Sequence, residues 1–253
     1  MIPIKAPWEV PFMRASGKLL SEVIAVIREQ VRPGVSPLEL DAICEEEIRR
    51  RGARPAFKGY QVGDDVFPNS LCASRNEQVI HGIPDDRPLK EGDLISLDFG
   101  LEYRGYFADS AFSVYLGDPP PRVQRLLDLT RESLYEAVAC ALAGARVGDI
   151  GHRVQKLAEA EGFGVVREYV GHGIGRRLHE APPVPNFGKA GTGVLLKPGM
   201  CVAIEPMITM GTHRTRLKKD RWTVVTADGS LSAHFEHTVL ITDSKPEILT
   251  SLQ

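Results

Sequence analysis

The chain has 253 residues, a formal net charge of −2, 43% apolar residues and 25% charged residues. This length suits one large domain, and the near-balanced charge gives no global sign of binding to nucleic acid or to a membrane surface. No apolar run is long enough to span a bilayer, and the N-terminal stretch lacks an apolar signal core. The four cysteines match neither a zinc motif nor a disulfide framework, so we expect a cytoplasmic protein with reduced thiols.

Two helices are predicted near the start of the chain. Apolar residues from Leu20 to Val31 recur at helical spacing, and Pro33 with Gly34 ends that helix. In the next helix, Ser36 is the predicted N-cap and Glu39 completes a capping box. Strand-like segments follow.

The same order of elements recurs in the second half. Ranges 120–144 and 149–162 have helical patterns, and strand-like segments follow at 163–170, 201–208 and 231–242. This repetition predicts an α+β fold built from a duplicated unit. No Ser/Gly-rich linker divides the chain, so we expect one domain over 1–253.

Two aspartates lie in a predicted hairpin, SLDFGLEYRGYFADS. A turn centred between Tyr103 and Arg104 would set Asp98 directly opposite Asp109, with Cβ atoms about 5 Å apart. Like charges there are destabilising, and the ordinary interpretation is one solvated and one salt-bridged carboxylate. A bound cation would turn this repulsion into an advantage.

Five further polar residues occur in comparable settings: Glu205 and Glu236 in apolar strands, His172 between glycines, His179 seven positions later, and His81 before a turn. Taken singly, these are ordinary strand-end carboxylates, a flexible glycine turn or a surface-loop histidine. Their spacing fits neither the HExxH zinc motif nor the GxGxxG dinucleotide motif. Together, the carboxylates and one imidazole form an oxygen-rich ligand set that suits two divalent ions.

The motifs HGIPDD, GHGIG, IEPM and EHT, with Asp98 and Asp109 eleven positions apart, closely resemble type I methionine aminopeptidases. These enzymes are pita-bread metallopeptidases, and the resemblance covers nearly the whole chain. It implies a pseudo-twofold duplicated α/β unit with a central antiparallel sheet and outer helices. It also implies removal of the N-terminal methionine from nascent proteins, with a preference for a small second residue.

The resemblance implies five metal ligands for two divalent ions, which could be Co, Mn, Fe(II) or Zn. Asp98 would chelate one ion. Asp109 and Glu236 would bridge both ions. His172 and Glu205 would complete the second site.

The resemblance also implies catalytic and substrate-binding roles. His81 would contact the substrate near the scissile amide, and His179 would steady the carbonyl or the tetrahedral intermediate. Glu205 would also carry a proton. The matching candidates for an apolar methionine pocket are Tyr60, Phe67, Cys72 and Trp222. Packing in the core is the alternative interpretation for each of these four.

The chain departs from the commonest bacterial pattern around this pocket. The stretch that contains Tyr60 is longer than usual, and Leu178 replaces a frequent aromatic residue. Gly100 and Ala203 stand where threonines often support the ligands. Separately, Asn76 and Ser232 match positions that hold a monovalent cation, so a Na or K ion is expected there.

Three alternative functions are distinguished by sequence features. Related X-Pro peptidases carry a large additional N-terminal domain. Type II methionine enzymes have an insertion between the second histidine and the IEP glutamate, whereas the segment 179–205 is compact here. Inactive binding modules lose metal ligands, and all five are present.

The expected partners are nascent polypeptide N-termini, without a membrane, for a monomeric enzyme. The segment 213–221 is basic, HRTRLKKDR. Its ordinary interpretation is a solvated hairpin loop. Its functional interpretation is a contact with ribosomal RNA phosphates.

Overall fold

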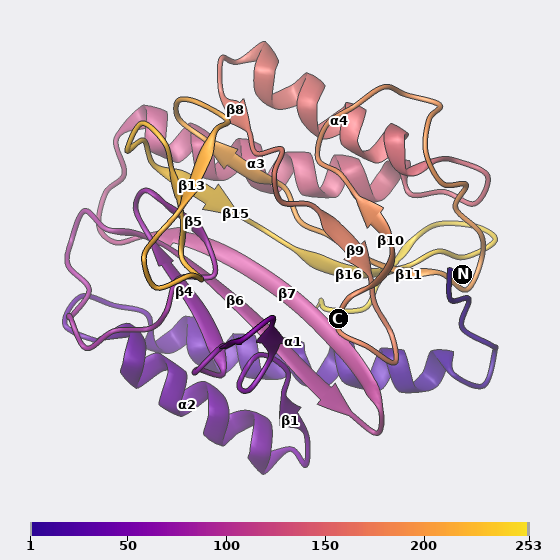
Figure 1. Ribbon diagram of the computed structural model, residues 1–253, viewed down its shortest axis with the longest axis horizontal. Coiled ribbons are helices and arrows are strands. Elements are labelled where there is room, and N and C mark those ends of the chain that lie inside the picture. The colour runs from indigo at the N-terminus through magenta and orange to yellow at the C-terminus, as the bar shows by residue number, and fades with distance from the viewer. Residues whose placement is uncertain (1, 252–253) are drawn as a thin grey trace.

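The protein is described by a computed structural model that covers residues 2–251, and Figure 1 shows its two helix pairs on either side of the strands. The first pair is α1 (Val10–Gln30) and α2 (Pro37–Arg50), and the second is α3 (Pro121–Cys140) and α4 (Val147–Ala160). The predicted capping box begins α2, because Ser36 accepts from the Glu39 N–H and the Glu39 carboxylate accepts from the Ser36 N–H. No helix within 2–251 is both long enough and apolar enough to cross a membrane.

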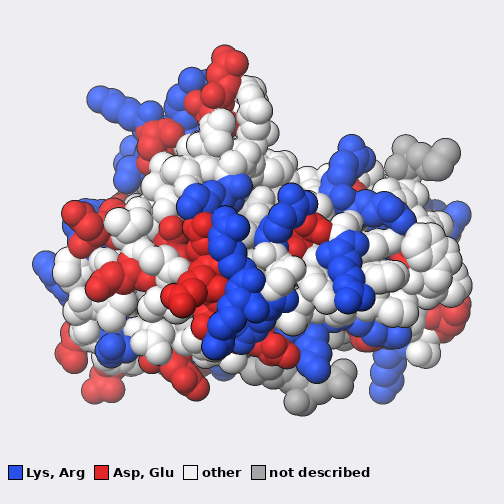
Figure 2. Space-filling model, turned by 90° about the horizontal axis from the view of Figure 1, so that it is seen from below, with Lys and Arg blue, Asp and Glu red and all other residues white. Residues whose placement is uncertain are grey.

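The face seen in Figure 2 carries basic and acidic side chains side by side. Helix α2 has both within a few residues: Arg49 pairs with Glu45 at 2.9 Å and Arg50 pairs with Glu47 at 2.6 Å. Such exposed pairs contribute little to stability. The surface of this helix therefore carries charges of both signs close together, in agreement with the near-zero net charge of the chain.

The first half contributes a four-stranded antiparallel sheet beside α1 and α2. Its long strands are β6 (Leu94–Tyr103) and β7 (Tyr106–Tyr115), and β6 also pairs with β4 (Leu71–Arg75) and β1 (Arg54–Pro55). Two short strands, β2 (Gln61–Val62) and β3 (Asp65–Val66), form a separate hairpin.

The second half contributes the strands β8 to β17, with β5 (Gln78–Ile80) joining one of its sheets. One sheet has the order β10-β9-β11-β16-β17, a second has the order β15-β12-β8, and a third has the order β13-β14-β5. Their bounds are β8 Gly164–Val165, β9 Gly171–Gly173, β10 Glu180–Val184, β11 Cys201–Ile204, β12 Met207–Thr209, β13 Thr215–Leu217, β14 Val224–Thr226, β15 Ser232–His234, β16 His237–Leu240 and β17 Glu247–Ile248.

The two halves join along β7. The Glu236 N–H donates to the Ala111 carbonyl at 3.0 Å, and the His234 N–H donates to Ser113 Oγ at 2.8 Å. A single hydrophobic cluster runs from Leu20 to Ile241 and therefore draws on both halves. The predicted succession of two helices and then strands, twice over, is confirmed.

Three predicted strands are interrupted. The segment 163–170 holds only the two-residue strand β8, because the chain bends at the exposed pair Arg167 and Glu168. The segment 201–208 breaks at Glu205 and Pro206, where proline lacks an N–H for the ladder. The segment 231–242 breaks at Glu236 and its preceding residue. Both glutamates therefore lie at interruptions between strands.

The register of the β6–β7 hairpin corrects the predicted pairing. Asp98 lies opposite Ala111, and Asp109 lies opposite Gly100. The reason is the turn: Arg104 and Gly105 both have positive φ, 54° and 84°, as a two-residue type I′ turn requires. The direct apposition of the aspartates was wrong, but they occupy diagonal positions on one face of the sheet, still within side-chain reach.

Candidate active site

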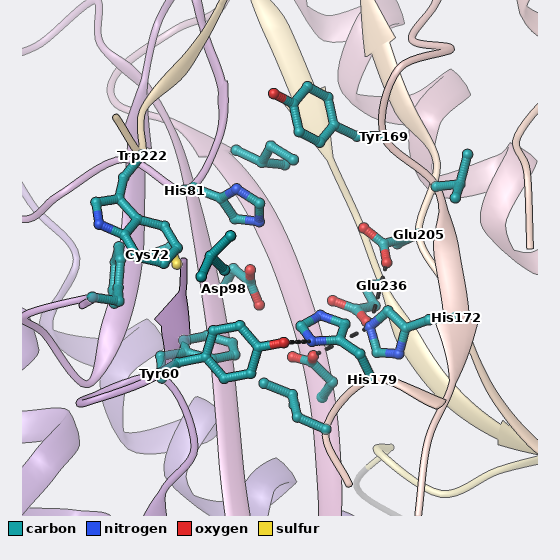
Figure 3. Close-up of a pocket in the computed structure, with 17 residues that line it drawn as sticks. Tyr60, Cys72, His81, Asp98, Tyr169, His172, His179, Glu205, Trp222 and Glu236 are labelled. Carbon is teal, nitrogen blue, oxygen red and sulfur yellow. Dashed lines mark hydrogen bonds and ion pairs between the residues drawn. The ribbon is translucent and has the colours of Figure 1, made fainter. Parts of the chain in front are cut away.

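Five potential ligands converge on one cavity of about 250 Å³ from different strands (Figure 3). Asp98 comes from β6, Asp109 from β7 and His172 from β9, while the two glutamates come from the strand interruptions. Four of the five are buried, and Asp98 is half-buried. The fold therefore brings the five predicted ligands together.

His172 lies among the carboxylates. Its Nε2 is 3.8 Å from Asp109 Oδ2 and 3.7 Å from Glu205 Oε1. Asp109, His172 and Glu236 each offer one ligand atom within a group whose members lie within 4.8 Å of one another. The other ring nitrogen, Nδ1, is 2.9 Å from the Gly173 carbonyl, to which it donates as Nδ1–H. This hydrogen bond leaves the Nε2 lone pair, on the side of Asp109 and Glu205, available to bind a cation.

The flanking glycines are required by close packing of β9. A Cβ on Gly171 would lie 2.3 Å from the Ala203 carbonyl oxygen, and a Cβ on Gly173 would lie 2.2 Å from the Ala181 carbonyl oxygen. Only glycine allows the neighbouring strands to approach this closely. The GHG sequence therefore places an imidazole in a crowded strand.

Three carboxylate oxygens are buried without a hydrogen-bond donor among the residues that the structure describes: Asp98 Oδ1, Asp109 Oδ1 and Glu236 Oε1. Buried acceptors are normally paired, and unpaired ones call for an explanation such as an ion. Oxygen ligands with one imidazole suit divalent metals such as Mn, Fe(II) and Co. The residues present therefore fit a metal centre.

Electrostatics lead to the same conclusion. Burial raises the pKa of Asp98 to about 7. The pKa of Asp109 is also raised well above its usual range, first by burial and then by the charges of Asp98 and Glu205. Burial raises the pKa values of Glu205 and Glu236 in the same way. Four carboxylates cannot all ionise here without cations to compensate them.

Two further histidines border the cavity. Burial lowers the pKa of His81 to about 4, and its ring meets Tyr169 edge-on at 6.0 Å. His179 is exposed to the cavity, and desolvation lowers its pKa. Its ring lies 4.2 Å from that of His172, and its Nδ1 is 2.6 Å from the Tyr60 hydroxyl (Figure 3). Both imidazoles are therefore neutral near pH 7.

The cavity has an apolar end, marked by Trp222 and Cys72, on the side away from Glu205 and His172 (Figure 3). Tyr60, Phe67, Cys72 and Trp222, the predicted pocket residues, all line it. Phe67 and Trp222 meet edge-on at 5.2 Å. The sequence interpretation missed other lining residues: Phe57, Val62, Ile80, Tyr169 and Val170. Of these, Phe57 and Tyr169 had a usable signal, as aromatic residues within three positions of a predicted site residue.

His234 was also missed. It is buried in β15, with its Nε2 3.7 Å from Glu205 Oε2 and without a hydrogen-bond partner within residues 2–251. Burial lowers its pKa to about 3. The sequence signal for His234 was its position two residues before Glu236, which would place both side chains on one face of a regular strand. The chain between β15 and β16 is not a regular strand, so this signal was weak.

The predicted monovalent site also brings its two residues together. The Ser232 N–H donates to the Asn76 carbonyl at 3.0 Å. The Asn76 side chain is engaged locally, because its Oδ1 accepts from the Leu94 N–H and its Nδ2 donates to Asp93. Cation binding here stays a prediction.

Comparisons with known proteins show which family the chain belongs to. Residues 11–243 match the model of metallopeptidase family M24. The chain is 47% identical to a methionine aminopeptidase of Clostridium perfringens, over 100% of both chains, and 45% identical to methionine aminopeptidase 1 of Bacillus subtilis, over 99% of both. A solved methionine aminopeptidase from Thermotoga maritima superimposes with a TM-score of 0.96, at 42% identity over 100% of both chains.

The chain therefore belongs to metallopeptidase family M24, and its fold is the pita-bread fold expected from the sequence. Prolidase from Pyrococcus furiosus shares the fold alone, with a TM-score of 0.78 at 21% identity. Within the family, the full-length relatives at 45–47% identity are methionine aminopeptidases, and this chain is a member of that group of hydrolases.

Proposed function

We propose that the enzyme removes N-terminal methionine from nascent proteins in the cytoplasm, with two divalent ions held by Asp98, Asp109, His172, Glu205 and Glu236. The observation that carries this proposal is the set of buried carboxylate oxygens without donors, at one end of a cavity whose other end is apolar. The apolar end has the aromatic and sulfur groups that favour a thioether side chain.

When bound, the divalent ions would supply an activated water at neutral pH and polarise the scissile carbonyl. The neutral His179 would donate to the carbonyl oxygen as negative charge develops there, and His81 also lines the cavity. Glu205 would carry a proton to the leaving amine. The free α-amine of the substrate would lie by the carboxylates, which restricts cleavage to chain ends.

A small second residue is proposed because three ring side chains line the cavity together with the carboxylates. They are His81, Tyr169 and His179, from three different connecting segments. A bulky side chain at that position would clash before the carbonyl reached the reactive geometry.

The decisive experiment combines metal analysis with peptide hydrolysis. The protein is purified without oxygen, stripped, and titrated with Fe(II), Mn, Co and Zn while hydrolysis of Met-Ala-Ser is measured. Two ions bound per active chain, and a higher kcat/KM for Met-Ala-Ser than for Met-Leu-Ser, are expected. Saturation of activity at one ion would refute the dinuclear proposal, and equal kcat/KM values would refute the small-residue preference. Ala-Pro-Ala serves as the control for X-Pro activity.

We also propose ribosomal docking through the basic segment 213–221, which comprises β13, the two residues before it and the turn toward β14. Arg214, Arg216, Lys218 and Lys219 are exposed, and none is within ion-pair distance of a carboxylate in the described part of the chain. Unpaired cations on a projecting hairpin are suited to phosphate contacts.

A further inference from the structure

The hairpin of β2 and β3 projects from the edge of the apolar pocket. At its base, the Phe67 N–H donates to the Tyr60 carbonyl at 2.8 Å, and the Gly59 N–H donates to the Phe67 carbonyl at 2.9 Å. Tyr60 and Phe67 both line the cavity. The six residues 61–66 therefore leave the pocket wall from one aromatic residue and return to it at the other.

The two faces of this hairpin differ because only one of them carries a residue that lines the cavity. Gln61 pairs with Val66, and Val62 pairs with Asp65, so each pair shares one face. Val62 lines the cavity, whereas Val66 does not. The two valines are otherwise alike, since their exposed fractions are 55% and 53%.

A contact on the Val62 face fixes its orientation. Asp65 Oδ2 lies 2.9 Å from Arg221 Nε, and the next residue in the chain is Trp222, a wall of the pocket. Arg221 is mostly exposed, so the ion pair contributes little to stability. Its effect is to hold the face that carries Val62 against the loop that delivers Trp222.

Val62 shares the lining of the cavity with Phe67 and Trp222, and more than half of its surface is exposed. A ligand side chain that filled the apolar end would cover it. The occupant to which the structure points is the side chain of the first substrate residue, because the apolar end is continuous with the carboxylates that would hold the α-amine.

We infer that Val62 is a specificity-determining residue: the β2–β3 hairpin forms the outer wall of the pocket and limits the length of the N-terminal side chain that is cleaved. This inference rests on the proposed function and deepens it. The excluded class is unbranched thioethers longer than methionine, of which ethionine, one methylene longer, is the simplest member.

The test compares Val62→Ala with the matched variant Val66→Ala, which removes the same atoms from the other face of the same hairpin. For each, kcat/KM is measured with Met-Ala-Ser and with ethionyl-Ala-Ser, using fully metal-loaded protein. One methylene in an apolar pocket changes kcat/KM by roughly 10–200-fold. The ratio of kcat/KM for Met-Ala-Ser to that for ethionyl-Ala-Ser measures the selectivity. Because Val62 is only partly enclosed, we expect this ratio to fall by about fivefold or more in Val62→Ala. In Val66→Ala it should match that of the unaltered enzyme.

Val62→Phe provides the opposite change, since a larger side chain shortens the pocket and should increase selectivity against ethionine. Unaltered selectivity in Val62→Ala, or an equal loss in Val66→Ala, would overturn the inference while Met-Ala-Ser is still hydrolysed. Absence of Met-Ala-Ser hydrolysis by the unaltered, metal-loaded protein would instead overturn the proposed function, and the inference with it.

Discussion

The Tyr60 hydroxyl lies 2.6 Å from Nδ1 of His179. Desolvation lowers the pKa of His179, so the ring is neutral near pH 7 and carries one proton. A tyrosine hydroxyl that donates to Nδ1 places this proton on Nε2. The nitrogen not bound to Tyr60 is then the one that can donate to a substrate carbonyl.

Tyr60→Phe should therefore lower kcat by about two- to tenfold, because one neutral hydrogen bond is worth roughly 0.5–1.5 kcal/mol. KM should change less, since the ring that lines the pocket is retained. The matched control is Tyr169→Phe, whose hydroxyl makes no hydrogen bond within residues 2–251. An equal loss of kcat in the two variants would contradict a specific role for Tyr60.

Asp109→Asn should abolish hydrolysis while the protein stays folded. Loss of a residue that merely supports a metal ligand costs 10–100-fold, so loss of a ligand should cost at least about 100-fold. The metal-free variant should be more stable than the metal-free parent at pH 8, by more than about 1 kcal/mol, because a carboxyl with a strongly raised pKa no longer has to ionise. Metal content and urea denaturation measure the two effects. Near-normal turnover with two ions retained would remove Asp109 from the ligand set.

The same carboxyl groups predict a pH dependence for the metal-free enzyme. Burial raises their pKa values, for Asp98 to about 7, so the folded state binds more protons than the unfolded state and loses stability as pH rises from about 4 through the folded pKa. The buried histidines, such as His172 with its pKa lowered to about 3, act in the opposite direction, but only below their unfolded pKa of about 6.5.

Above about pH 6.5 and below about pH 8, where thiols begin to ionise, the carboxyl effect is isolated. We expect the Tm of the chelator-treated protein to fall across this window, while that of the metal-saturated protein changes much less. Each proton released corresponds to at most about 1.4 kcal/mol per pH unit. A Tm that rises with pH in the chelator-treated protein would contradict the raised pKa values.

Much of the fold could be predicted because periodicity reports which face of an element is buried. Ser36 and Glu39 form their capping box as expected, since capping depends on residues three positions apart. The hairpin register could not be fixed from pattern alone. A turn at Arg104 and Gly105 requires positive φ at a non-glycine residue. Moving the centre of the turn by one residue shifts the strand pairing by two, so Asp98 lies diagonal to Asp109 on the same face instead of opposite it.

The candidate site shows the same limit. The ligand carboxylates could be found because each is a charge within an apolar, strand-like stretch of sequence. His234 could not, because its significance depends on Glu205, from which it is separated by 29 positions and the whole β13–β14 hairpin. The apolar pattern of its strand indicates burial but does not indicate which buried polar groups meet. Val62 was missed for the opposite reason, since an exposed valine in a polar hairpin has no sequence signal of a pocket.

A buried ion pair connects the start of the chain to the first residue of β10. Lys5 Nζ lies 2.7 Å from Glu180 Oε2, and the two side chains are only 4% and 3% exposed. Lys5→Met leaves a buried carboxylate unpaired and should cost about 3–5 kcal/mol in the free energy of unfolding. Adding Glu180→Gln removes that charge and should restore part of the loss. Arg14→Met, which breaks the exposed pair with Glu247, should cost less than about 1 kcal/mol. A double variant less stable than Lys5→Met alone would contradict this account.

Charge reversal in the basic segment 213–221 should change ribosome binding without changing catalysis. Lys218→Glu with Lys219→Glu reverses two exposed charges outside the cavity lining. If the hairpin contacts ribosomal RNA, binding to ribosomes should weaken, and the slope of log affinity against log salt should fall by about 1 for each phosphate that the variant no longer binds. Hydrolysis of Met-Ala-Ser should be unchanged.

The matched control is Lys189→Glu with Lys197→Glu, which makes the same change in net charge at exposed positions before β11. Since a general charge effect would weaken both variants equally, only weakening confined to the first variant supports docking through this hairpin. Unaltered ribosome affinity across salt concentrations would leave it a solvated turn.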